Sequence, residues 1–163
     1  MSVAIFRHLY GYHFAENRAL WDNHILQLSH AAFSQPSRYA HGSIQKQILH
    51  LIEVEEVWFC GLRGVDFPDP LEPAHYSDYT TLRAYWDAVE AHTTTYLDTI
   101  TEAKLHSQPL EGEDKELRVW QVLLQVVNHA TDHRAQILRA LHDMGHKTTS
   151  QDYIFYAYKH PAS

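Results

Sequence analysis

Three histidines interrupt the apolar lines of two segments that have helical periodicity. His129 and His133 lie four positions apart within segment 117–144. Four residues advance an α-helix by about 400°, so both side chains project from one face, and two imidazoles at this spacing can bind one ion. His50 lies in an equally apolar line of segment 43–60. The spacing therefore predicts a divalent-metal site made of His50, His129 and His133.

Core histidines are the alternative to metal ligands, because an inward-facing histidine is commonly a hydrogen-bonded part of the core. Pairs of this spacing also arise by chance in a chain with 14 histidines. Ten of the other histidines are predicted to lie on the surface or at the rim: His8, His13, His24, His30, His75, His92, His106, His142, His146 and His160.

Three neutral imidazoles add no negative charge, so a bound ion stays a Lewis acid with a fourth position for water or substrate. Such a site suits hydrolysis, and it suits a thiol bound as thiolate. Asn17, Glu53 and Asp132 are the weak candidates for a catalytic base; a solvated helix surface or, for Asn17, a satisfied buried amide is the alternative. Ala130 stands where a zincin requires glutamate, which argues against a protease.

Long helices must position these residues, since the apolar pattern has a period of 3.6 residues and no strand-like alternation. Helices are predicted over 2–33, 43–60, 77–100 and 117–144, with a short fifth helix over 151–160. Ser43 and Ser77 are the expected N-caps, and Gly145 is the expected stop of the fourth helix. Three of the six prolines fall in segment 65–77, which predicts a long crossover. Val54 and Val57 are expected on the buried side of the second helix.

Length and composition limit the classes of protein to which the chain can belong. The length of 163 residues predicts a single domain, and one cysteine, Cys60, excludes an intramolecular disulfide. Twenty acidic against thirteen basic residues give a formal charge of −7, so we expect no nucleic-acid partner. Neither a leader peptide nor a run of about 18 apolar residues is present, so we expect a cytoplasmic protein without a membrane partner.

Four segments resemble the DinB/YfiT-like family of metalloenzymes, and together they cover nearly the whole chain. YGYHFAENRALW is similar to the first-helix signature of that family, with Asn17 as its polar residue. SIQKQILHLIEVEEVWF is similar to the second-helix motif, with His50 at the ligand position. VVNHATDHRAQILRALHDMG resembles the strongest signature, in which His129 and His133 are ligands. DYIFYAYKH resembles the aromatic C-terminal ending.

The resemblance implies an all-α four-helix bundle with long crossover connections, often a homodimer, that binds zinc or nickel through His50, His129 and His133. It also implies a small-molecule substrate or a thiol, since the superfamily includes thiol-dependent transferases and isomerases. A hydrolase or a thiol S-transferase is therefore expected. The alternative is a non-catalytic module, either a metal-organised ligand-binding protein or a dimeric interaction protein. Asp132 departs from the family pattern without removing a ligand.

Overall fold

The structure, a computed structural model, describes residues 2–38 and 41–161, and all regular elements within these ranges are helical. Four helices are long: α1 (Val3–Asn23), α3 (Ile44–Arg63), α4 (Tyr79–Thr99) and α6 (Val119–Asp143). The short elements are η1 (Ile25–Gln27), α2 (His30–Ser34), η2 (Pro73–Tyr76), α5 (Glu102–Leu105), η3 (Gly112–Asp114) and α7 (Tyr153–Lys159). The predicted all-α class is confirmed.

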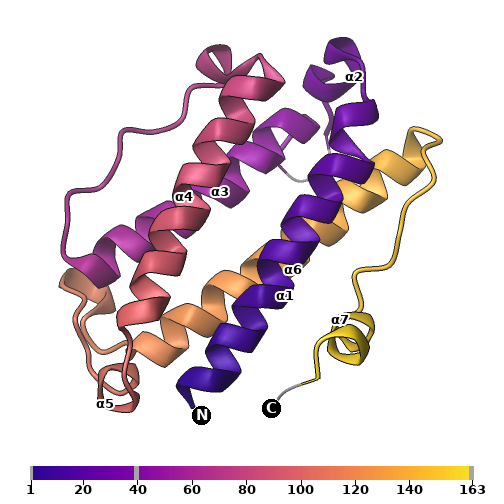
Figure 1. The fold of residues 1–163 in the computed structure, drawn as a ribbon. Coiled ribbons are helices and arrows are strands. Elements are labelled where there is room, and N and C mark those ends of the chain that lie inside the picture. Colours follow the sequence, from indigo (N-terminus) through magenta and orange to yellow (C-terminus); the bar gives the residue numbers. More distant parts are fainter. Residues whose placement is uncertain (1, 39–40, 162–163) are drawn as a thin grey trace.

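The four long helices form a bundle in which α3 packs against α4 and α6, and α1 packs against α6 (Figure 1). The connection between α3 and α4 runs back along the bundle, so these two helices point in the same direction (Figure 1). This is the crossover that the proline-rich segment predicts. The short helix α7 lies against α1, where the ring of Tyr12 contacts Tyr153 and Tyr156 edge-on at centroid distances of 5.4 and 5.9 Å.

Side-chain caps determine where the central helices begin. Ser43 caps α3 as predicted, because its hydroxyl accepts a hydrogen bond from the backbone N–H of Lys46 at 3.2 Å. The prediction that Ser77 caps the next long helix is wrong. Asp78 is the N-cap, and its two carboxylate oxygens accept from the backbone N–H groups of Thr80 and Thr81 at 3.0 and 2.8 Å. A carboxylate at this position also interacts favourably with the helix dipole.

The first helix is shorter than the predicted span of 2–33. It ends at Asn23, and a 3-10 turn follows before Ser29 caps the separate helix α2 by accepting from Ala32 N–H at 3.2 Å. Ile25 and Leu28 remain buried across the interruption. Their spacing therefore continues the apolar pattern of α1, although the backbone leaves the α-helical conformation.

Two buried apolar clusters fill the bundle. Along three helices, a buried polar side chain lies between residues of one cluster and residues of the other, and these side chains form a polar layer. On α1, Asn17 falls between Phe14 of one cluster and Leu20 of the other. On α3, Glu55 falls between Ile52 and Phe59 in the same way. On α4, Thr93 likewise lies between a residue of one cluster and a residue of the other. Polar groups buried in this way require partners within the protein.

The prediction that Val54 and Val57 lie on the buried side of the second long helix is wrong. Val57 is 36% exposed and Val54 is only half-buried, whereas Glu55 is 2% exposed. The side of α3 that contains Glu55, and not the side that contains Val57, is therefore the buried one. Cys60 is buried in the same helix.

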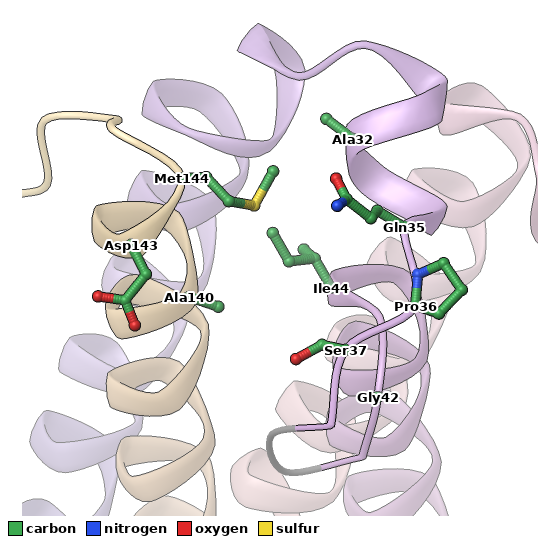
Figure 2. A pocket seen from close by; sticks show the side chains of 9 residues that line it. All are labelled: Ala32, Gln35, Pro36, Ser37, Gly42, Ile44, Ala140, Asp143 and Met144. Atoms are coloured by element: carbon green, nitrogen blue, oxygen red, sulfur yellow. The ribbon is translucent and has the colours of Figure 1, made fainter.

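The segment that leads from α2 into α3 borders a pocket of about 200 Å³ near the C-terminal end of α6 (Figure 2). Ile44 and Ala140 contribute apolar surface to it, and Ser37 and Asp143 contribute polar groups. Gly42 also lines the pocket. None of the helices within the described ranges is long and apolar enough to cross a membrane.

Candidate metal site

The structure brings His50, His129 and His133 together between α3 and α6. The ring centroid of His50 lies 5.1 Å from that of His129 and 4.7 Å from that of His133. The two rings on α6 are 4.2 Å apart, as the spacing of one helical turn predicts. Because α3 and α6 pack directly on each other, residues far apart in the sequence share one small volume.

Burial differs among these rings. His133 is 6% exposed, while His50 and His129 are half-buried. The Nδ1 atom of His133 is buried and has no hydrogen-bond partner among the described residues. An unpaired buried nitrogen is costly, so this atom is suited to a partner that the protein itself does not supply.

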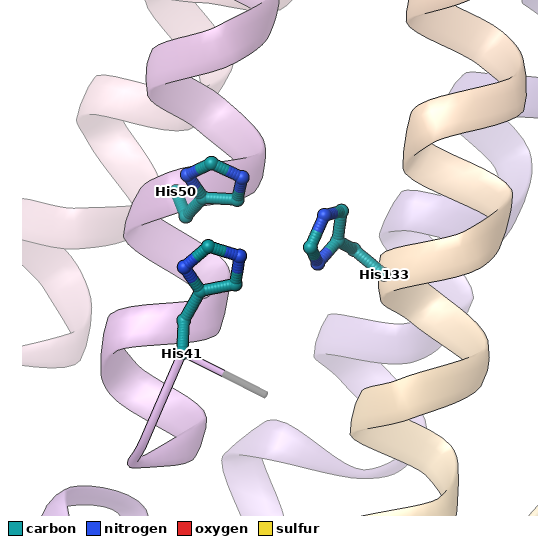
Figure 3. A group of neighbouring side chains, drawn as sticks. All are labelled: His41, His50 and His133. Carbon is teal, nitrogen blue, oxygen red and sulfur yellow. The ribbon is translucent and has the colours of Figure 1, made fainter. Parts of the chain in front are cut away.

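A fourth histidine, His41, joins the group from the turn before α3 (Figure 3). Its ring stacks on His50, with centroids 3.8 Å apart and planes inclined by 20°, and its centroid lies 5.1 Å from that of His133. Nitrogen atoms of His41, His50 and His133 all lie within 4.8 Å of one another. Sequence reasoning missed His41 because it belongs to no helical stripe. The only available signal was its place two residues before the N-cap Ser43.

The electrostatics of the cluster favour neutral rings. Burial, followed by the nearby His41, His133 and His129, lowers the pKa of His50 to about 4. Burial and the neighbouring His133 lower the pKa of His129 to about 4, against the opposing effect of Asp132. Burial and His41 also lower the pKa of His133. Neutral imidazole is the form that binds a metal ion.

The donor set fits a transition-metal ion. The ring centroids of the predicted His50, His129 and His133 lie 4.2–5.1 Å apart. Among the described residues, however, the histidines whose ligand nitrogen atoms all lie within 4.8 Å of one another are His41, His50 and His133, a set that does not include His129. Imidazole nitrogen suits zinc, nickel, copper and iron, whereas magnesium and calcium prefer oxygen. The cluster is therefore compatible with metal binding.

The three candidate bases occupy different environments. Asp132 is exposed, and its carboxylate accepts a hydrogen bond from the Gln136 amide at 2.9 Å. Glu53 is half-buried, and its carboxylate accepts from the backbone N–H of Leu71 at 3.2 Å, which ties the crossover to α3. Of the three, only Asp132 acts electrostatically on rings of the cluster, those of His129 and His133.

Asn17 belongs to the buried polar layer. Its carbonyl oxygen accepts a hydrogen bond from the Arg134 guanidinium at 2.8 Å, and its amide lies 3.2 Å from Nε2 of His13. The prediction that His13 lies at the surface is wrong, because its side chain is completely buried and contacts Glu55 at 3.0 Å. His13, Asn17 and Arg134 are thus structural partners of one another. The satisfied buried amide that the sequence offered as the alternative for Asn17 is therefore confirmed. The burial of His13 was not predicted, because its partners come from different helices.

Comparison with known proteins agrees with the resemblance seen in the sequence motifs. The model of the family described as "DinB family" matches residues 1–162. No curated protein matches the chain.

Proposed function

Because the chain belongs to the DinB family, we propose that it binds one divalent metal ion, zinc or nickel, through His50, His129 and His133 and uses it to transform a small molecule. The observation that carries this proposal is the convergence of His50 with the histidine pair of α6. Two helices that pack directly on each other carry these three rings, which supports the assignment of both helices to one site.

The chemistry proposed for the site is hydrolysis or thiol transfer. A divalent ion held by neutral imidazoles is a Lewis acid that can polarise a substrate carbonyl or hold a thiol as thiolate. Asp132 is the candidate proton acceptor, because its carboxylate is exposed and acts on the rings of His129 and His133. Glu53 and Asn17 have protein partners that hold them elsewhere.

Metal analysis of protein purified without a histidine tag tests the proposal. The wild-type chain should retain one zinc or nickel ion after dialysis, and His129→Ala should lose it. His142→Ala is the matched control, since His142 is an exposed residue of the same helix outside the cluster. Absence of metal from the wild type, or full retention by His129→Ala, would overturn the proposed ligand set.

Substrate screening with the metal-loaded protein tests the catalytic part. Panels of esters, amides and thiol acceptors should reveal turnover that disappears in His129→Ala and persists in His142→Ala. Saturable binding of a small molecule without turnover across these panels would instead support a non-catalytic ligand-binding module.

A further inference from the structure

His41 lies against the proposed metal site although it is not one of the three proposed ligands. Its ring stacks on His50, and its ligand nitrogen lies within 4.8 Å of those of His50 and His133 (Figure 3). Nitrogen atoms around a tetrahedral zinc ion with bonds of 2.0–2.1 Å are about 3.3 Å apart. Small side-chain rotations therefore suffice to bring His41 to the same ion.

The described part of the chain offers no other partner that would hold this ring in place. His41 is exposed, and among residues 2–38 and 41–161 it has no hydrogen bond or ion pair to a protein group. A cation shared among the rings would account for the position of His41.

The backbone delivers His41 from a defined turn and not from a helix. Gly42 has φ +94°, a left-handed conformation that glycine adopts without strain, and Ser43 then caps α3. His41 is thus tied to the first turn of the helix that carries His50. Unlike the three helix-borne rings, it can move away without disturbing a helix.

On the basis of the proposed function, we propose that His41 is a fourth ligand of the same ion and that it yields its position to the substrate. With an ion bound, the bond from the His41 nitrogen would break as a donor atom of the substrate, a thiolate sulfur or an oxygen, formed its own bond, and the proton lost by a thiol would pass to solvent. The exchange transfers no electrons. The three helix-borne histidines keep the ion in place while the turn-borne ligand leaves.

X-ray absorption spectroscopy of the zinc-loaded protein counts the imidazole ligands directly. The wild type should show four, and His41→Ala should show three imidazoles and one oxygen donor without the outer-shell scattering of a ring. Competition titration with a chelator should show weaker zinc binding by His41→Ala, by at least the roughly tenfold that loss of an outer-shell partner costs. His75→Ala is the control, because His75 is exposed and lies outside the cluster.

Addition of 2-mercaptoethanol tests the exchange. The cobalt-substituted wild type should develop a thiolate-to-metal absorption band and lose one imidazole, and His41→Ala should bind the thiol more tightly because no ring must leave. Wild-type protein that binds zinc with three imidazoles, and His41→Ala with unchanged affinity, would overturn this inference and leave the three-histidine site intact. Wild-type protein without zinc would overturn both.

Discussion

The guanidinium of Arg134 donates a hydrogen bond to Nδ1 of His13, with the two nitrogen atoms 3.3 Å apart in the buried polar layer. An arginine side chain can only donate, so Nδ1 of His13 is the acceptor. Its Nε2 then carries the proton and donates to the Glu55 carboxylate at 3.0 Å, so the Asn17 amide nitrogen 3.2 Å away donates no hydrogen bond to Nε2 in this tautomer. The contact therefore holds His13 in its neutral form within the core.

Acid should destabilise the protein through His13. Burial lowers the pKa of His13, the Arg134 charge acts in the same direction, and Glu55 opposes both. The unfolded chain has an ordinary histidine pKa of about 6.5. Below that pH the unfolded state binds a proton that the folded state does not, so stability falls from about pH 6.5 down to the folded pKa.

His13→Gln isolates this effect, because a glutamine amide can donate to Glu55 and accept from Arg134 without titrating. Urea unfolding in the presence of a chelator, from pH 7.5 to 5, should show a shallower pH dependence for the variant. The difference in slope should reach at most about 1.4 kcal/mol per pH unit. Parallel curves for the two proteins would contradict the assignment.

Arg134→Met should destabilise the fold by about 2–5 kcal/mol, because each buried acceptor left without a donor costs about 1–3 kcal/mol. Arg134 is 1% exposed and its guanidinium donates to Asn17 and to Gln151, so its loss leaves several buried acceptors without a donor. Arg139→Met, on the same helix, should cost less than about 1 kcal/mol, because the ion pair of Arg139 with Asp143 is exposed. If urea unfolding showed equal losses of stability in the two variants, Arg134 would contribute no more to the free energy of unfolding than an exposed arginine does.

Helical periodicity was sufficient to predict the helices and the meeting of His50 with the α6 pair. That success has a physical cause: ligands borne by regular helices follow the 3.6-residue period that apolar residues also follow. The break after Asn23 escaped prediction because Ile25 and Leu28 stay buried through the 3-10 turn. Spacing alone does not distinguish the two backbone conformations.

Some of the residues that sequence reasoning placed wrongly depend on partners from other helices. His13 reads as a surface residue because it is polar, and its burial depends on Glu55 and Arg134 from α3 and α6. On α3, the charged Glu55 is 2% exposed and the apolar Val57 is 36% exposed, the reverse of what their polarity predicts. His41 is positioned by a turn, for which no periodic signal exists.

Zinc should stabilise the folded protein by mass action, since the assembled ligand set exists only in the folded state. At a free zinc concentration one hundred times the Kd, the expected gain is about 2.7 kcal/mol. For a chain of this size the corresponding rise in Tm is roughly 5–10 °C. His133→Ala should remove the rise, and the exposed control His142→Ala should retain it, as measured by calorimetry. An equal rise in His133→Ala would place the zinc elsewhere.

Gly42→Ala should weaken metal binding through the backbone and not through the loss of a ligand. A β-carbon at Gly42 would meet only ordinary contacts at 3.8 Å, so there is room for alanine. Only the positive φ of +94° disfavours alanine at this position. The strain should cost about 1–2 kcal/mol or be relieved by a change in the turn, and that change would draw His41 away from His50.

Gly64→Ala is the matched control for that substitution, because Gly64 caps the other end of α3 with φ +66° and open space around its α-carbon. Both variants should lose comparable stability in urea unfolding of the metal-free protein. Only Gly42→Ala should bind zinc more weakly in a chelator competition, since only that turn carries a histidine of the cluster. Equal zinc affinities in the two variants would mean that the conformation of the 41–43 turn does not govern the fourth ligand.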